Sequence, residues 1–427
     1  MHLQNNRFKH FSYCLRFGGV LILTALIAGL GGILLHEFLD LIEYLVFGHG
    51  ETSTAQAVST KQFILIVLAG IISAILWYFL QRKNRQIISV KSQMKAENPA
   101  SRMPKLWIHL TNIFLQVASV GAGSPIGKEG APRELGALGA GRVSDYLKLT
   151  LQDRKLAIAC GASAGLAAVY QVPIASIFFA FETLGLGISV LNLISVSVTT
   201  ILASLIAGVV ISDAPLYEAG QVTLDVKTAI LAMVLAVIIS PIAQLFRRFT
   251  QKAQAQKATD YTILWRLPLT FLLLASLSLV FPEILGNGGA MAQGVFDGMT
   301  VQYAAGIVVV KAFVVLLTLK NGAYGGTLTP SFSMGAVLGF LGAVLCSQIF
   351  PTISLASAML IGSSVFLAIT MNAPLTAIGL VVSFTGQKLQ ALPILLIAVA
   401  VAIFIKHLIE RNSYVNPYRS QTRRNRR

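Results

Sequence analysis

Nine apolar runs of about the length that crosses a lipid bilayer constrain the fold of this 427-residue chain more than any other feature. Because hydrocarbon offers the backbone no hydrogen-bond partner, segments that cross a bilayer are helices or strands of closed barrels, and a spanning helix needs about 20 apolar residues. Of all residues, 55% are hydrophobic and 12% are charged, whereas a soluble domain has about 25% charged residues. The sequence therefore predicts an all-α polytopic membrane protein. The runs lie near 17–37, 62–80, 107–122, 191–211, 225–246, 263–281, 303–319, 332–350 and 391–409.

The formal net charge of +16 is concentrated at the chain ends and in short loops. The positive-inside rule interprets such clusters as cytoplasmic anchors, which predicts a cell-membrane protein with both termini in the cytoplasm. No soluble domain remains to hold a nucleic acid, so the charge does not indicate nucleic-acid binding. The first apolar run has no convincing cleavage site and is interpreted as a membrane helix, not a signal peptide. The basic residues of these clusters are Arg7, Lys9, Arg16, Arg82, Lys83, Arg85, Arg247, Arg248, Arg419, Arg423, Arg424, Arg426 and Arg427.

Shorter apolar stretches rich in glycine lie between the long runs, near 121–142, 156–187, 322–342 and 355–385. We interpret them as half-helices broken by glycine and proline. Irregular backbone at membrane depth is tolerated only where protein or a water-filled cavity surrounds it. The broken stretches are therefore expected to line a site.

Two of these broken stretches repeat along the chain. Residues 161–177 (GASAGLAAVYQVPIASI) resemble residues 362–378 (GSSVFLAITMNAPLTAI) at an offset of 201, and GKEGAP (127–132) aligns with GGTLTP (325–330) at an offset of 198. Paired interrupted segments in two halves point to a transporter with its binding site at the interface between the repeats. We predict an N-terminal repeat over 1–215, a C-terminal repeat over 222–410 and a short basic tail over 411–427.

The segment GSPIGKEGAPRE (123–134) is the first candidate anion site. Gly127 and Gly130 free the backbone, so that successive N–H groups at a helix start can form an anion-binding nest, and Lys128 adds positive charge. Glu129 places a carboxylate where those groups would attract an anion. It could compete with the anion and leave when protonated, acting as gate and proton carrier. The alternative is an i,i+4 ion pair between Glu129 and Arg133.

The segment GAYGGTLTPSFSMG (322–335) is the second candidate anion site. The backbone donors of Gly326, Thr327, Leu328 and Thr329 are expected to face an anion, and the hydroxyl of Thr329 can donate a further hydrogen bond. The alternative is an ordinary capped membrane helix. The repeat relation to the first motif favours the anion site.

The remaining ionisable groups carry less information. Glu182 is interpreted as a solvated carboxylate at a helix end. Lys311, inside an apolar run, is expected to snorkel, form a pair or add positive potential near an ion path. His36 and His109 are given no role.

No metal site, cofactor site or disulfide framework is predicted, because the three cysteines Cys14, Cys160 and Cys346 lie far apart. An enzyme is the weaker class of function, since no nucleophile–base pair is visible. An unrelated repeat transporter for a neutral or cationic solute is disfavoured because the repeats converge on backbone donors. A structural membrane protein would not need the broken, paired segments.

Four motifs in order, GKEGAP, AGLAAVYQVPIASIFFAFE, GGTLTPSFSMG and AITMNAPLTAI, resemble those of the chloride-channel (CLC) superfamily. The resemblance implies a homodimer in which each subunit holds its own anion pathway between two inverted-topology repeats. It implies that Glu129 is the external gating glutamate and that Leu328 and Thr329 belong to the segment that binds the central anion. The pathway tyrosine would be Tyr414 or Tyr418.

Departures from the family pattern resemble its fluoride/proton antiporter branch. Ala131 replaces the proline after the gate, the serine loop has no counterpart near residues 85–89, and Thr183 replaces the internal proton-relay glutamate. The T-P-S turn and the segments GNGG (286–289) and APRE (131–134) are also similar to that branch. The leading hypothesis is halide transport as fluoride/proton antiport, with a halide, protons and the lipid bilayer as partners. The alternative is a chloride/proton antiporter or a voltage-gated-type chloride channel.

Overall fold

The computed structural model describes residues 2–48, 57–81, 87–96, 105–347 and 354–415. All regular secondary structure in these ranges is helical apart from one isolated bridge between two residues, so the predicted all-α fold is confirmed. In chain order the elements are α1 (His2–Phe47), α2 (Thr60–Gln81), α3 (Val90–Lys95), α5 (Leu106–Gly121), α6 (Gly130–Tyr146), α7 (Leu151–Tyr170), α8 (Pro173–Glu182), α9 (Val190–Ala207), α10 (Val226–Ala255), α11 (Ile263–Ser278), η1 (Pro282–Ile284), α12 (Gly289–Gly298), α13 (Val301–Lys320), α14 (Leu328–Ser347), α15 (Leu355–Met371), α16 (Pro374–Phe384), η2 (Leu389–Ala391) and α17 (Leu392–Val415).

A helix covers each of the nine predicted apolar runs. Within the described ranges, seven helices are long and apolar enough to cross a membrane, namely α1, α2, α9, α10, α13, α14 and α17, whereas α5 and α11 are shorter. The predicted span over 332–350 is confirmed as far as Ser347, where the description of this segment stops. The predicted broken stretch over 322–342 is a loop followed by the continuous helix α14, which begins at Leu328.

The predicted repeat is visible in local backbone geometry. Helix α7 ends at Gln171 with φ 53° and ψ 43°, and α15 ends at Asn372 with φ 56° and ψ 42°. The left-handed conformation is uncommon for residues other than glycine, and it stops the helix. Two residues later, Pro173 and Pro374 open α8 and α16, where a missing N–H costs nothing. The offset is 201 residues at both positions; the repeat boundaries near 215 and 222 stay predictions.

Close contacts between glycine residues of neighbouring helices occur in both halves of the chain. A Cβ atom on Gly136 of α6 would lie 1.9 Å from the carbonyl oxygen of Gly161 in α7. The equivalent pair in the second half is Gly335 of α14 and Gly362 of α15, where a Cβ on Gly362 would lie 2.3 Å from the Gly335 oxygen. Small residues let membrane helices approach backbone to backbone. The same contact therefore fixes both helix pairs.

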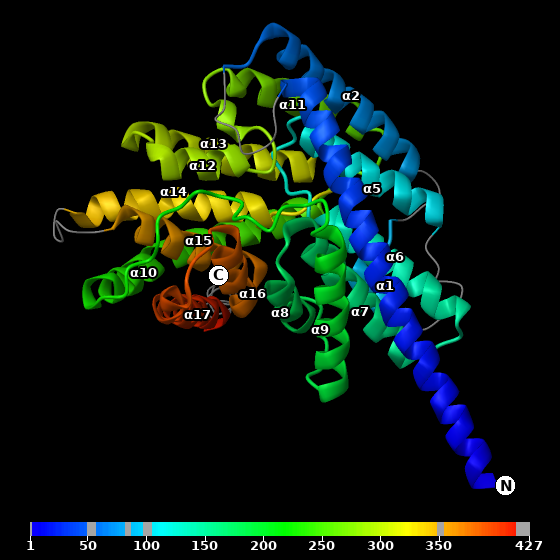
Figure 1. The fold of residues 1–427 in the computed structure, drawn as a ribbon. Helices are drawn as coiled ribbons and strands as arrows, with labels where there is room; N and C mark the ends of the chain where they lie inside the picture. The colour runs from blue at the N-terminus through cyan, green and yellow to red at the C-terminus, as the bar shows by residue number, and fades with distance from the viewer. Residues whose placement is uncertain (1, 49–56, 82–86, 97–104, 348–353, 416–427) are drawn as a thin grey trace, which may run out of the picture.

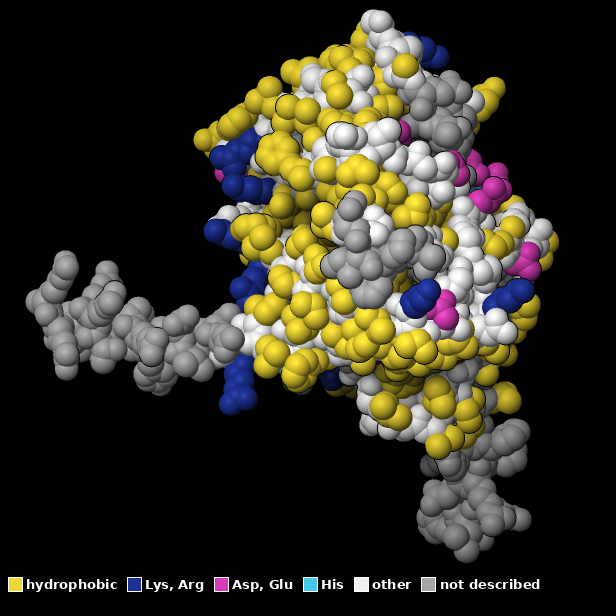
Figure 2. Space-filling view, turned by 90° about the vertical axis from the view of Figure 1, so that its left-hand side faces the viewer, with side chains coloured by type: hydrophobic (Ala, Val, Ile, Leu, Met, Phe, Trp, Pro, Cys, Tyr) yellow, Lys and Arg dark blue, Asp and Glu magenta, His cyan; other side chains and the backbone are white. Residues whose placement is uncertain are grey.

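Helices α6 and α14 begin near the centre of the molecule and run outward to different sides (Figure 1). Hydrophobic side chains form broad patches over the face of the molecule that Figure 2 shows. In that view most Lys and Arg side chains gather along one edge, while the visible Asp and Glu lie in the other half. An apolar surface with charge segregated to its edges suits a protein that lies in a bilayer.

We expect Gly161→Val to destabilise the fold by about 1–3 kcal/mol, because the new side chain must displace the backbone of α6. A Cβ at this position would lie 2.2 Å from the Gly136 oxygen. Thermal unfolding of the purified protein in detergent would measure the loss. Gly187→Ala is the control, since nothing lies within 4 Å of a Cβ there. Equal melting temperatures for the two variants would contradict the packing argument.

Candidate anion-binding site

Two loops, one from each half of the chain, are joined at the centre of the molecule. The Gly127 N–H donates to the Gly326 carbonyl at 2.8 Å, and the Gly326 N–H donates to the Gly127 carbonyl at 2.9 Å. In the repeat alignment Gly127 is equivalent to Gly325, which directly precedes its hydrogen-bond partner Gly326. Helix α6 begins three residues after Gly127, and α14 begins two residues after Gly326. The bridge therefore holds two helix N-termini together.

Helix N-termini present unpaired N–H groups and the positive end of the helix dipole, so two of them facing one point form an anion-binding site. The Glu129 carboxylate lies at this point and is 1% exposed. Its Oε1 accepts a hydrogen bond from the Leu328 N–H at 2.7 Å, and its Oε2 has no hydrogen-bond partner within the described chain. A negatively charged side chain thus lies where a free anion would bind.

Glycine at the bridge leaves the room that this carboxylate needs. A Cβ on Gly326 would lie 1.8 Å from Glu129 Oε1, and a Cβ on Gly127 would lie 1.9 Å from Oε2. Any larger residue at either position would expel the carboxylate from the bridge. The two glycines therefore have a steric function.

The alternative interpretation, an ion pair between Arg133 and the Glu129 side chain, is wrong because Arg133 hydrogen-bonds to a different acceptor. Arg133 Nε donates to the backbone carbonyl of Glu129 at 2.6 Å, and its guanidinium lies 5.3 Å from the centroid of the Phe179 ring. The nearby Lys128 is 8% exposed, and its ammonium lies 5.8 Å from the Tyr170 ring centroid. The carboxylate turns to α14, and Arg133 and Lys128 add positive charge near it.

The second loop is accessible at one end and closed at the other. Residues 324–327 are partly exposed, whereas Leu328 and Thr329 are buried. The hydroxyls of Thr329 and Ser331 have no hydrogen-bond partner in the described part of the chain. Backbone N–H groups, two free hydroxyls and an accessible approach therefore meet at the start of α14.

The predicted site residues fall into two groups. Gly127 and Glu129 of the first loop contact Gly326 and Leu328 of the second, and Lys128 and Gly130 flank Glu129 in the chain. The two candidate tyrosines are not placed at the site. Tyr414 lies in the last turn of α17, where its side chain is not described, and Tyr418 lies outside the described residues.

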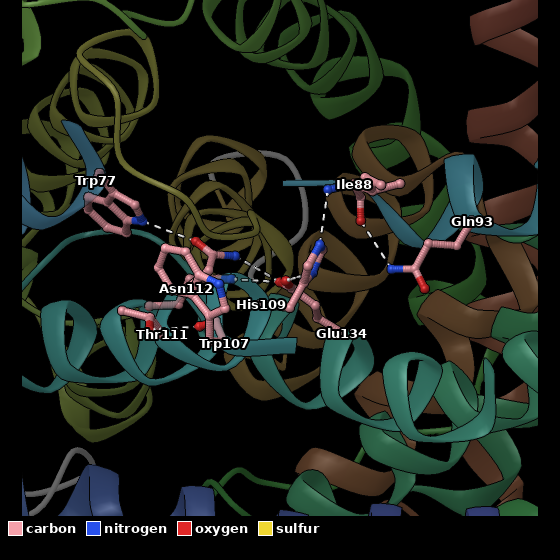
Figure 3. A network of polar contacts seen from close by, with 9 residues as sticks. Trp77, Ile88, Gln93, Trp107, His109, Thr111, Asn112 and Glu134 are labelled. Atoms are coloured by element: carbon pink, nitrogen blue, oxygen red, sulfur yellow. Dashed lines mark hydrogen bonds and ion pairs between the residues drawn. The ribbon is translucent and has the colours of Figure 1, made fainter. Parts of the chain in front are cut away.

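Sequence analysis missed a buried polar network behind the start of α6 (Figure 3). The Glu134 carboxylate accepts hydrogen bonds from Asn112 Nδ2 at 2.9 Å and from Gln116 Nε2 at 3.0 Å, and its Oε1 lies 2.6 Å from His109 Nδ1. Asn112 Oδ1 in turn accepts from Trp77 Nε1 at 3.0 Å. The spacing of the three α5 residues, at i, i+3 and i+7, was a signal of one helix face.

The second hydrogen-bond partner of His109 shows which nitrogen of its imidazole ring carries the proton. The Ile88 backbone N–H points at His109 Nε2 over 3.3 Å. Because a backbone N–H can only donate, Nε2 is the acceptor and the hydrogen lies on Nδ1, which donates to Glu134. The carboxylate thus has three donors, and the network ties α6 to α5 and α2. Gln116 also contacts the start of α6, since a Cβ on Gly130 would lie 2.4 Å from its Oε1.

Glu182 lies at a helix end as predicted, but its carboxylate binds protein donors and is not simply solvated. Its Oε1 accepts from the Leu375 N–H at 2.9 Å, and its Oε2 accepts from the N–H and hydroxyl of Thr376 at 2.8 and 2.7 Å. Glu182, the last residue of α8, therefore caps the N-terminus of α16. It connects the first half of the chain to the second at a distance from the Gly127–Gly326 bridge.

Lys311, for which sequence left several roles open, is paired with backbone. It is fully buried, and its ammonium donates to the carbonyls of Ile284 and Gly286 at 2.7 and 2.8 Å. No group of three metal-binding side chains is found among the residues that the structure covers. Cys14, Cys160 and Cys346 are free thiols.

Comparison with known proteins gives one family. A family model described as "voltage gated chloride channel" matches residues 69–407. The "voltage-gated ClC-type chloride channel ClcB" of Escherichia coli O17:K52:H18 (strain UMN026) is 32% identical over 316 residues, which cover 71% of this chain and 73% of that protein. ClcB of Escherichia coli strain K12/DH10B is 31% identical over 315 residues with the same coverage.

Two solved structures share the fold. A slow cyanobacterial Cl⁻/H⁺ antiporter has a TM-score of 0.78 at 19% identity, covering 93% of this chain and 98% of its own. A CLC-type fluoride/proton antiporter has a TM-score of 0.73 at 20% identity, covering 91% and 94%. At these identities the likeness concerns the fold alone, and it agrees with the predicted polytopic all-α architecture.

We expect Glu134→Ala to lower the free energy of unfolding by about 3 kcal/mol, because three buried donors lose their shared acceptor. Thermal unfolding in detergent would detect it. Glu218→Ala is the matched control, since that side chain is exposed. A Glu134→Ala protein as stable as this control would show that the network does not hold α6.

Proposed function

Because the chain belongs to the voltage-gated chloride channel family, we propose that it moves a halide anion across the cell membrane in exchange for protons, with Glu129 as gate and proton carrier. It is a transporter or channel, not an enzyme. One observation carries the proposal: the Glu129 carboxylate accepts the Leu328 N–H at the start of α14. An anion entering the site needs the same donors.

The exchange follows from competition for those donors. While Glu129 is ionised, it satisfies the helix ends and repels a second negative charge. Its Oε2, which has no partner in the described chain, is the atom that accepts the proton. The neutral side chain loses its attraction to the helix ends and leaves. A halide then gives up water for the N–H groups of residues 128–130 and 327–329, until Glu129 releases its proton and returns.

Chloride is the better supported ion. The relatives at 31–32% identity are described as chloride channels, and a structural neighbour is a Cl⁻/H⁺ antiporter. The sequence-based preference for fluoride gains no specific support from the comparisons. Fluoride remains the second candidate because of the buried, unpartnered hydroxyls of Thr329 and Ser331. A small anion is costly to dehydrate and needs additional donors at its site.

Two further features belong to this proposal. We infer that the loop after α10 and both termini lie in the cytoplasm, and the basic clusters at the end of α10 and at the chain termini support this orientation. The functional unit is a homodimer with one pathway in each subunit, as the family resemblance implies.

We expect Glu129→Gln to abolish proton coupling while leaving halide movement, because the amide cannot carry a proton. Halide efflux from liposomes that contain the purified protein would be followed with a halide electrode and a pH probe. Glu218→Gln, a change at an exposed carboxylate, is the control. Halide exchange in Glu129→Gln that a pH gradient still drives would refute the role of Glu129.

The same liposomes separate the two candidate ions. We expect chloride to leave at least as fast as fluoride, with proton movement in the opposite direction. Fluoride efflux much faster than chloride efflux would establish the second candidate instead. Chloride efflux without proton movement in the wild type would make the protein a channel and overturn the exchange.

A further inference from the structure

Lys257 lies in the loop between α10 and α11 with its ammonium over an aromatic ring. Its Nζ is 3.5 Å from the centroid of the Tyr324 ring. Within the described ranges the ammonium has neither an ion pair nor a hydrogen bond to the protein, and the residue is partly exposed. A cation–π contact leaves the N–H groups that point away from the ring free to donate. The site is therefore a cation with unused donors.

Tyr324 connects this cation to the anion site. It directly precedes Gly325 and Gly326, and residues 324–327, like Lys257, are partly exposed. The ring also packs against Trp77, with centroids 5.9 Å apart. Burial, and to a lesser degree the charge of Glu134, raises the pKa of Tyr324 to about 12. Tyr324 is thus an uncharged support for the cation.

The charged groups around Lys257 leave a net positive charge. Two carboxylates lie in the surroundings, and both have other partners: Asp260 accepts from the Thr262 N–H at 3.2 Å and from its hydroxyl, and Glu134 lies 2.6 Å from His109. The chain also passes close to α13, since the Ala258 N–H donates to the Lys320 carbonyl at 2.9 Å. The other cations on the surrounding elements are Lys252, Arg266 and Lys320.

We propose that Lys257, supported by Tyr324, forms a separate halide-binding site at the mouth of the approach that leads along residues 325–327 to Glu129. This inference rests on the proposed function. Even a partly buried ammonium without a counter-ion carries a desolvation cost. A halide that binds the free N–H groups of Lys257 lowers this cost. The bound halide then lies next to the loop that leads to the N–H groups at the start of α14.

Proton binding and anion binding are coupled at this site. Burial lowers the pKa of Lys257 to about 7. The charged form, which binds the halide, dominates below that pH and is lost above it. About 90% of Lys257 is charged at pH 6 and about 3% at pH 8.5, so the apparent halide affinity should fall about 30-fold between them.

The test uses the full chain in liposomes with the same pH on both sides. Initial chloride efflux would be measured against chloride concentration at pH 6 and pH 8.5, in the wild type, Lys257→Arg, Lys257→Gln and Lys252→Gln. Arginine keeps the charge and the contact with the ring but does not titrate. Lys252→Gln removes an exposed positive charge near the end of α10, five residues before Lys257. Titration of Glu129 affects all four proteins alike. Dividing the half-saturating chloride concentration of each protein by that of Lys257→Arg therefore isolates the contribution of Lys257.

We expect the half-saturating chloride concentration of the wild type, relative to Lys257→Arg, to rise up to about 30-fold between pH 6 and pH 8.5. Lys257→Gln should need about tenfold more chloride than the wild type at pH 6, as expected for a lost charge-assisted contact, while Lys252→Gln should match the wild type. Equal pH dependence in wild type and Lys257→Arg would overturn the site, even if Lys257→Gln fails to fold. Absence of any halide efflux in the wild type would instead refute the proposed function.

Discussion

The pair of backbone hydrogen bonds between Gly127 and Gly326 is the constraint on which the rest of the structure depends. It brings two helix N-termini to one point inside a protein built for a bilayer, where their partial positive charges have little solvent to screen them. Such a point is unfavourable unless a negative charge lies on it. The Glu129 carboxylate supplies that charge. In the proposed exchange a halide must therefore replace the carboxylate, and the site alternates between two anions.

The glycine contacts are what allow two half-helices to meet there. Gly136 against Gly161 and Gly335 against Gly362 bring α6 onto α7 and α14 onto α15 at backbone distance. Without side chains at these positions, the helices pack closely enough to fix where α6 and α14 begin. The left-handed ends at Gln171 and Asn372 then turn the chain in the same way in both halves. One packing solution, used twice, produces the converging helix starts.

The buried charges differ in how completely they are satisfied, and this separates structural from proposed functional groups. Lys311 donates to two carbonyls, and the Glu134 carboxylate has three donors, so neither has reason to change its state. Glu129 has one donor and one oxygen without a partner in the described chain. The partly exposed ammonium of Lys257 contacts the Tyr324 ring and has no ion pair within the described ranges. Groups that must exchange a proton or an ion are expected to be incompletely paired, because full pairing would fix them in one state.

The sequence by itself determined the class of fold, the approximate position of each long helix and the segment that contains Glu129, because apolar length and glycine–proline breaks are local properties of the chain. It also located the repeat, since the two left-handed ends share its offset. Only the tertiary structure decided partners: that Gly127 bonds to Gly326, that Glu182 caps α16, that His109 joins Glu134, and that Lys257 reaches Tyr324. These contacts join residues far apart in the chain. Which donors meet a given carboxylate depends on how the helices pack, and side-chain packing between distant segments leaves no periodic signal in the sequence.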